Sequence, residues 1–363
     1  MLNIRKLYEL IYNFHLLKNQ TKIEIIHFKN DKSKTIKDNI SDSPFFSSKF
    51  KKDLDTQIVN NQYQISITGS IQANINIYTS SLSIAKIRKL INYIMFIVYL
   101  NEYHWNKELS STLNIYIVPL DIKKSLPKYN KTNTIPIGIE NINSASTNIY
   151  FNNPGMGEVF IWRKSELSKV LVHELLHSFN YDQNLLNFSK SNTSIFENIN
   201  SLNLNETYTE LTANILCLAL NSFKDVKGMN KSLLFKNFKK IFYEKLEKEN
   251  KLSKSNVKKL LKYNKLDNVD DFVSKKYRQD ASIFSYVILK AAIINQIYNQ
   301  RNSKYKEISF LKDFPMIFSG NKITYLNELT RFFNDKRWQK NFENLSKKNV
   351  KTSGQLYFTT IKG

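Results

Sequence analysis

The segment His173-Glu174-Leu175-Leu176-His177 carries the residue types of a catalytic metal site. On a helix, a spacing of four residues places both imidazoles on one face, about one turn apart. Two imidazoles in this arrangement can bind one metal ion, and the glutamate between them can act as a base toward a water molecule. The chain has 5 histidines, and two of them lie here. We therefore predict one Zn²⁺ per chain, with His173 and His177 as ligands and Glu174 as the catalytic base.

A catalytic zinc ion usually takes a third protein ligand and keeps one position open. The metzincin pattern would place a His or Asp six residues after His177, where this chain has Gln183, so that class is excluded. Asp182 is one alternative. The other is Glu206, which shares a helix face with Glu210 at the start of an apolar run. Carboxylates are also favoured at a helix start for electrostatic reasons alone, which is the structural explanation for both glutamates.

The motif His173-Glu174-x-x-His177 followed by Asn205-Glu206-x-x-Thr209-Glu210 resembles the gluzincin pattern of thermolysin-like metallopeptidases. The resemblance implies that Glu206 is the third zinc ligand and that Glu210 orients a ligand imidazole. The chain departs from the pattern, with Thr209 for a serine and Glu210 for an aspartate. The 28 residues between His177 and Glu206 exceed the interval in thermolysin and exclude close homology.

Residues 110–300 also look like uncharacterised gluzincin-like proteins of large DNA viruses, which implies a zincin-like fold but no substrate. Thermolysin-like enzymes stabilise the oxyanion with a tyrosine and a histidine, and no histidine follows His177 in this chain. Tyr286 and Arg278 are the candidates for that role, with ordinary packing or surface positions as the alternative reading. We retain Tyr286 as the predicted second catalytic residue.

The segments around the motif predict a strand that leads into the metal-binding helix. Residues 158–162 are largely apolar and Ser165 is a plausible N-cap. Apolar residues then recur at helical spacing up to Leu175, without Gly or Pro. The helix would fix the ligand geometry, and a neighbouring strand edge could pair with an extended substrate.

The remaining pattern predicts an α+β zincin-like fold, with a small mixed sheet and the zinc-binding helix before a mainly helical C-terminal part. We expect an N-terminal segment that is partly loop (1–60), a catalytic core (61–222) and a helical subdomain (223–363). Predicted strands are 22–28, one or two within 64–79, 113–119 and one within 134–153; predicted loops are 30–55 and 183–202; predicted helices are 1–17, 83–102, 231–248, 254–263, 281–298 and 322–345.

The net charge of +23 admits nucleic acid, an anionic membrane or an acidic substrate as a partner. The lysines are scattered and no nucleic-acid motif accompanies them, so solvated surface lysines are the default reading. The single Cys217 excludes an internal disulfide, and we expect it to be a buried hydrophobe. No signal peptide or membrane span is evident. We expect a soluble intracellular protein, in the cell, the host cytoplasm or a virion.

These observations predict a zinc metalloendopeptidase that hydrolyses peptide bonds by means of a zinc-activated water, with Glu174 as general base. A protein or peptide would be the substrate. Two other classes remain open: a catalytically inactive zincin-fold binding protein, and a basic nucleic-acid-binding or virion protein. The oligomeric state is not predicted.

Overall fold

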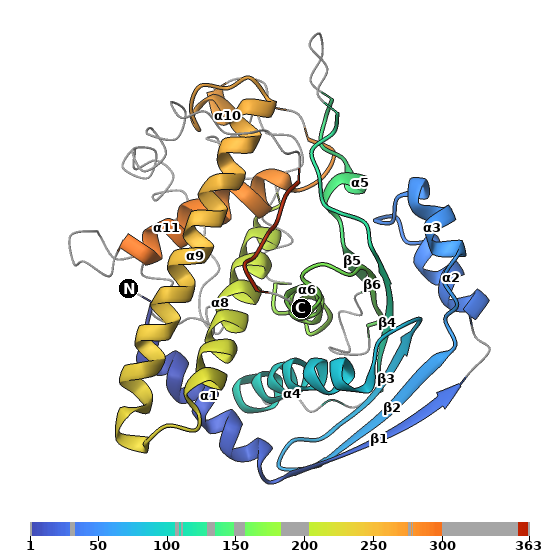
Figure 1. Cartoon of the computed structure of the whole chain (residues 1–363), viewed down its shortest axis with the longest axis vertical. Coiled ribbons are helices and arrows are strands. Elements are labelled where there is room, and N and C mark those ends of the chain that lie inside the picture. The colour runs from blue at the N-terminus through green and yellow to red at the C-terminus, as the bar shows by residue number, and fades with distance from the viewer. Residues whose placement is uncertain are drawn as a thin grey trace. The chain divides into compact units, whose positions relative to one another are not determined.

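The structure, a computed structural model, describes residues 2–29, 33–105, 109, 112–128, 135–148, 157–182, 203–274, 277, 279–299 and 355–361 (Figure 1). The predicted loop 183–202, the predicted helix 322–345 and the candidate Arg278 lie outside these residues. The chain divides into two compact units. The helical unit comprises Met1–Glu9, Lys124–Ile142 and Asn184–Thr360, and the sheet unit comprises Leu10–Lys123, Asn143–Gln183 and Ile361–Gly363.

The sheet unit is built on six strands in the order β1-β2-β3-β4-β6-β5. The bounds are β1 Thr21–Lys29, β2 Asn61–Gly69, β3 Ala73–Thr79, β4 Leu113–Leu120, β5 Ala145–Thr147 and β6 Val159–Arg163. β1, β2 and β3 pair antiparallel, β3, β4 and β6 pair parallel, and β5 closes the order antiparallel to β6. The predicted α+β class with a mixed sheet is therefore confirmed.

The hairpin between β2 and β3 depends on Gly69, the residue around which the sequence predicted one or two strands. Its φ of +110° lies in a region that side-chain-bearing residues rarely adopt. A Cβ at this position would stand 2.6 Å from the carbonyl oxygen of Gln20. The segment 64–79 thus contains two strands, β2 and β3, and Gly69 at the end of β2 permits the close approach of the chain at Gln20.

Helices cover both faces of the sheet in the sheet unit (Figure 1). α4 (Ile84–Trp105) contacts the metal-motif helix α6 (Leu167–Ser178), which in turn contacts β5 and β6. The other face is covered by α2 (Ser33–Ser41) and α3 (Lys51–Asp55). The prediction that 30–55 is a loop was therefore wrong. Its few apolar side chains, among them Ile36, Ile40 and Leu54, are buried in one cluster with Trp162, so packing on the sheet overrides the polar composition.

The helical unit contains α8 (Leu204–Val226), α9 (Leu234–Tyr263), the π-helix η4 (Phe284–Leu289) and α11 (Lys290–Asn299), which contact one another. Shorter helices are α5 Ile139–Ile142, η3 Lys231–Leu233 and α10 Asp271–Ser274, and the sheet unit adds η1 Ser48–Phe50. The sequence predicted two helices in place of α9. The helix continues through the polar stretch because no Gly or Pro interrupts it and because Glu249, Asn250 and Ser253 are buried.

The first helix, α1 (Ile4–Lys18), confirms the predicted N-terminal helix. In its first half, Tyr8 packs against Phe223 and Phe238 of the helical unit. In its second half, Phe14 packs against Phe96 of α4 in the sheet unit. Both halves are therefore held by aromatic packing, each in its own unit.

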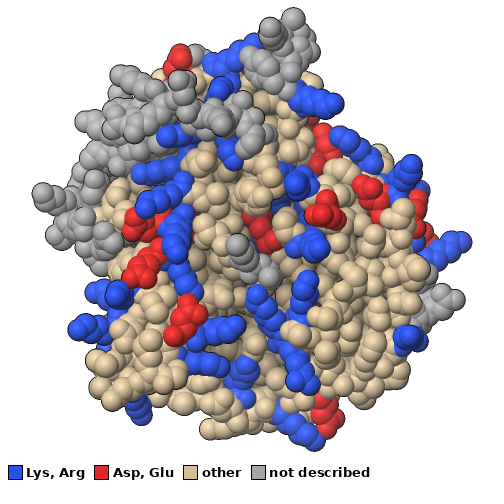
Figure 2. Space-filling model, viewed as in Figure 1, with Lys and Arg blue, Asp and Glu red and all other residues tan. Residues whose placement is uncertain are grey.

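Charged side chains do not gather into one basic stripe on the face shown in Figure 2, where Asp and Glu side chains lie among the Lys and Arg side chains. On the exposed side of α9, Lys251 pairs with Glu247, and Lys245 pairs with Asp225 of α8. Cys217 is buried, as predicted. Among the described residues, no helix has both the length and the apolar character needed to cross a bilayer.

Candidate metal site

α6 begins directly after β6, as the sequence predicted, but its N-cap is Glu166 and not Ser165. Glu166 adopts a left-handed backbone conformation with φ 62°, and its carbonyl accepts the first helical hydrogen bond, from Val170 N–H at 2.9 Å. The turn at Glu166 joins the buried strand to the helix. As a result, His173, Glu174 and His177 all lie on a helix whose residues are buried throughout.

The end of α6 places a carboxylate on one of the two histidines. Asn180 adopts φ 56°, its N–H donates to His177 O at 2.8 Å, and Tyr181 N–H donates to Leu176 O at 2.9 Å. This pair of bonds is the Schellman helix ending, in which a left-handed residue reverses the chain. The reversal brings Asp182 back to the helix, where its Oδ2 lies 2.7 Å from Nδ1 of His177.

The contact with Asp182 fixes the tautomer of His177. Since an ionised carboxylate only accepts hydrogen bonds, Nδ1 carries the hydrogen and the Nε2 lone pair remains available for a metal ion. Nε2 of His177 lies 3.1 Å from Nε2 of His173. Two imidazole nitrogens that bind one tetrahedral zinc ion stand about 3.3 Å apart. The two predicted ligands in the sheet unit therefore fit one ion.

Glu174 is held by the edge strand of the sheet. Thr147 on β5 donates its hydroxyl to Oε2 of Glu174 at 2.6 Å, and the same hydroxyl lies 3.2 Å from the carbonyl oxygen of Glu174. A neutral hydroxyl orients the carboxylate without neutralising its charge. Thr147 was not identified from the sequence, because the contact joins residues 27 positions apart.

The segment that leads into β5 is anchored by the end of β6. Trp162 Nε1–H and Arg163 Nε–H both donate to the carbonyl oxygen of Asn143, at 3.2 and 2.6 Å. Burial lowers the pKa of Arg163 to about 10, because the charged guanidinium loses hydration. These bonds fix the start of β5, and with it Thr147. The predicted strand at 158–162 is an inner strand, because β6 lies between β4 and β5 in the sheet. The edge beside α6 belongs to β5, which lies within 134–153, where the sequence predicted a strand.

In the helical unit, the structure brings together Glu206 and Tyr286. Glu206 lies in the first turn of α8, and the hydroxyl of Tyr286 donates to its Oε2 at 3.0 Å. Tyr286 belongs to the π-helix η4, a conformation that is rare and frequent at functional sites. Asn203 Nδ2 also donates to Ser282 Oγ at 2.8 Å, which ties the start of α8 to the segment before η4. The predicted roles of Glu206 as a zinc ligand and Tyr286 as an oxyanion donor stay predictions.

Glu210 pairs with a lysine of the helical unit. Lys290 Nζ lies 3.1 Å from Glu210 Oε1, and the two side chains are only 3 % and 1 % exposed. The proposed contact between Glu210 and an imidazole stays a prediction. The carboxylate that the structure places on a predicted ligand imidazole is Asp182. The signal in the sequence for that role was its position five residues after His177, just beyond the helix end.

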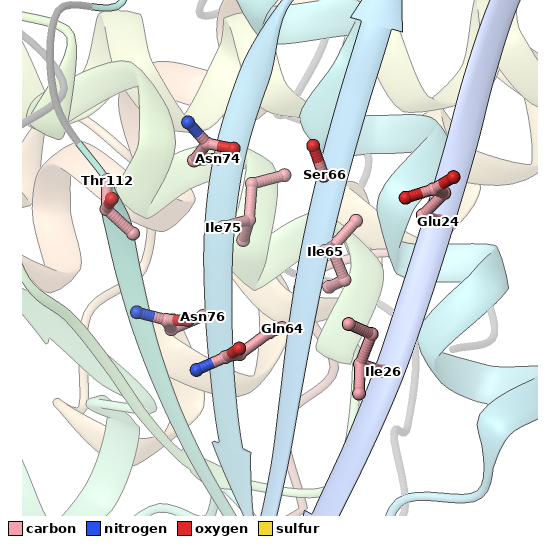
Figure 3. A pocket seen from close by; sticks show the side chains of 9 residues that line it. All are labelled: Glu24, Ile26, Gln64, Ile65, Ser66, Asn74, Ile75, Asn76 and Thr112. Carbon is pink, nitrogen blue, oxygen red and sulfur yellow. The ribbon is translucent and has the colours of Figure 1, made fainter.

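A separate pocket lies on the open part of the sheet, over β1, β2 and β3 (Figure 3). Its side chains are mainly polar: Glu24, Gln64, Ser66, Asn74 and Asn76, with Ile26 beside them. None of the predicted site residues lines it. The chemistry predicted from the sequence is therefore not located in this pocket.

Comparison of the chain with protein-family models, with curated proteins and with solved structures found no match.

Proposed function

We propose that the protein is a zinc-dependent metallopeptidase with a zincin-like fold. The observation that carries the proposal is the pair of Nε2 atoms on α6, 3.1 Å apart, with Glu174 on the same helix. His173 and His177 of the sheet unit are suited to hold one metal ion, and in this proposal Glu206 of the helical unit is the third ligand. Two imidazoles and a carboxylate are the donor set of many catalytic zinc sites.

A bound zinc ion would polarise the scissile carbonyl and lower the pKa of water in the site. Glu174 accepts the proton of the attacking water and delivers it to the leaving amine nitrogen. The hydroxyl of Thr147 holds Oε2 of this carboxylate in one orientation, so the base does not have to be ordered during the reaction. Asp182 keeps the hydrogen of His177 on Nδ1, and Tyr286 holds the Glu206 carboxylate.

The substrate in this proposal is an extended peptide that pairs with β5. Extended peptides bind sheet edges through main-chain hydrogen bonds, and β5 is the last strand in the sheet order. Thr147 is the final residue of β5 and contacts Glu174 directly. A peptide paired with this strand would therefore run past the base.

The test measures zinc content and peptide hydrolysis in the same set of variants. Wild type should contain one zinc per chain by elemental mass spectrometry, and His177→Ala and Glu206→Ala should lose most of it. Glu174→Gln should keep zinc but lose at least about 10²-fold of the turnover of a quenched-fluorescent peptide library, since a general base contributes 10²–10⁴. Glu244→Gln, on the surface of α9, removes the same charge and should match wild type in both measurements.

Each alternative gives a distinct result. Full turnover in Glu174→Gln would contradict the role of the base. Zinc without hydrolysis in wild type would favour a zincin-fold binding protein. Absence of zinc from the wild-type protein after loading would contradict the metal site and favour the basic surface as the functional feature.

A further inference from the structure

The segment Gln355–Thr360 lies on the helical unit, and its side chains alternate between buried and exposed from Leu356 to Phe358. Leu356 and Phe358 are 1 % and 3 % exposed, whereas Tyr357 between them is 44 % exposed. Gln355 forms an isolated antiparallel bridge with Ser125, and Leu356 N–H donates to the carbonyl oxygen of Lys124 at 2.9 Å. The first part of the segment, up to Phe358, therefore has the period of two of a strand-like peptide, whereas Thr359 is buried like Phe358.

Side chains of the helical unit hold the main chain of this segment. Lys259 Nζ donates to Gln355 O at 2.6 Å, and Asn256 Nδ2 donates to Tyr357 O at 2.5 Å. Lys290 Nζ donates to Phe358 O at 2.5 Å. Main-chain groups are common to all peptides, so these three contacts contribute to binding without depending on the sequence of the peptide.

The far end of the segment is held by the buried carboxylate of Glu249 on α9. Its Oε2 accepts the main-chain N–H of Thr360 at 2.7 Å and the hydroxyls of Thr359 and Thr360 at 3.2 and 2.9 Å. Asn214 Nδ2 donates to the other oxygen at 3.0 Å. A buried carboxylate that takes one main-chain amide and two hydroxyls selects for hydroxyl residues at this position.

The ring of Phe358 adds side-chain selectivity. Lys124 Nζ lies 4.2 Å from the ring centroid, and the Tyr286 ring centroid lies 6.0 Å away. Ammonium groups are attracted to the face of an aromatic ring. The site thus requires an aromatic residue, followed by residues with hydroxyl groups.

We propose that this surface, from Lys124 across α9 to Lys290, is a peptide-binding groove whose resident ligand is the chain's own Gln355–Thr360 segment. The segment docks reversibly, and a separate peptide of the same chemistry competes for the groove. The ring of Phe358 contacts Tyr286, which holds Glu206. The carbonyl oxygen of Phe358 accepts a hydrogen bond from Lys290, which holds Glu210. Occupation of the groove therefore fixes both side chains. An effect of this occupation on catalysis rests on the proposed function, because it requires Glu206 to be a zinc ligand. Binding of the peptide itself does not rest on it.

The test uses the full chain and a labelled peptide, Gln-Leu-Tyr-Phe-Thr-Thr, with fluorescence anisotropy as the readout. Phe358→Ala weakens the resident segment, so this variant should bind the peptide at least about tenfold more tightly than wild type, since the tethered segment competes at millimolar effective concentration. The matched control Tyr357→Ala alters an exposed side chain of the same segment and should behave as wild type. A peptide with Ala in place of Phe should not bind.

Two results would overturn the groove: a folded Phe358→Ala variant that does not bind the peptide, or equal binding of the peptides with and without the aromatic ring. Should Phe358→Ala fail to fold, hydrogen exchange on the wild-type protein tests whether the segment leaves the groove. Reversible docking requires the amides of Leu356 and Thr360 to exchange at least about tenfold faster than the interior amides of α9. Exchange at the same rate as α9 would make the segment a fixed part of the core.

Discussion

The contact between Asp182 and His177 predicts that zinc affinity depends on a residue that is not itself a ligand. The two side chains are 1 % and 9 % exposed, and Oδ2 lies 2.7 Å from Nδ1. Removal of a carboxylate that orients a ligand imidazole typically costs 10–100-fold in metal affinity. Asp182→Asn keeps an oxygen acceptor but loses the charge, so we expect about a tenfold loss. Asp182→Ala loses both, and we expect about a hundredfold loss.

The measurement is competition with a chromophoric zinc chelator at neutral pH. Asp225→Asn is the matched control, since it removes the same charge from the ion pair of Asp225 with Lys245. Ion pairs at the surface contribute little to stability. Thermal unfolding of each apo variant separates a loss of affinity from a loss of folding. A change of less than twofold in Asp182→Ala, with the apo protein folded, would refute the reasoning that this carboxylate orients a ligand.

Four further outcomes follow from the contacts in the two units. Thr147→Val removes the hydroxyl on Glu174 and should lower turnover about tenfold with zinc content unchanged; normal turnover would contradict the orienting role. Tyr286→Phe should lower zinc affinity about tenfold, since it releases the Glu206 carboxylate; a collapse of turnover at unchanged affinity would instead support the oxyanion role. Lys290→Met removes the ammonium group that faces the buried Glu210 carboxylate and should lower the free energy of unfolding by about 3–5 kcal/mol in urea titration, and a loss under about 1 kcal/mol would contradict a stabilising ion pair. Removal of zinc with a chelator should lower the thermal midpoint by several degrees in wild type, because a ligand present at 100 times its Kd stabilises by about 2.7 kcal/mol.

The periodicity of apolar residues predicted the helices and strands whose own sequence contains a clear apolar pattern. The strand before α6, the helix α6 itself and the start of α8 were predicted from apolar spacing and from the absence of Gly and Pro. The region 30–55 was not, because its helices α2 and α3 owe their stability to contacts with the sheet. The single helix α9 was missed for a related reason, since its polar middle part reads as a break until its burial is known.

The site residues also differ in whether local spacing alone could identify them. His173, Glu174 and His177 could be identified because one helix turn sets their relation. The partner of His177 lies only five residues away, yet its role depends on the left-handed Asn180 that ends the helix. Contacts between distant parts of the chain, such as that of Thr147 with Glu174, leave no spacing that a sequence could reveal.

The partners of the acidic residues separate those suited to chemistry from those suited to stability. A buried carboxylate is costly unless it is hydrogen-bonded or paired with a cation. Buried Glu174 accepts a hydrogen bond from the hydroxyl of Thr147, and half-buried Glu206 accepts one from the hydroxyl of Tyr286; both donors are neutral. Glu210 faces an ammonium group that cancels its charge. A base and a zinc ligand both need that charge, so the hydroxyl-bonded pair fits the proposed chemistry, whereas Glu210 fits a buried ion pair that fixes α11 against α8.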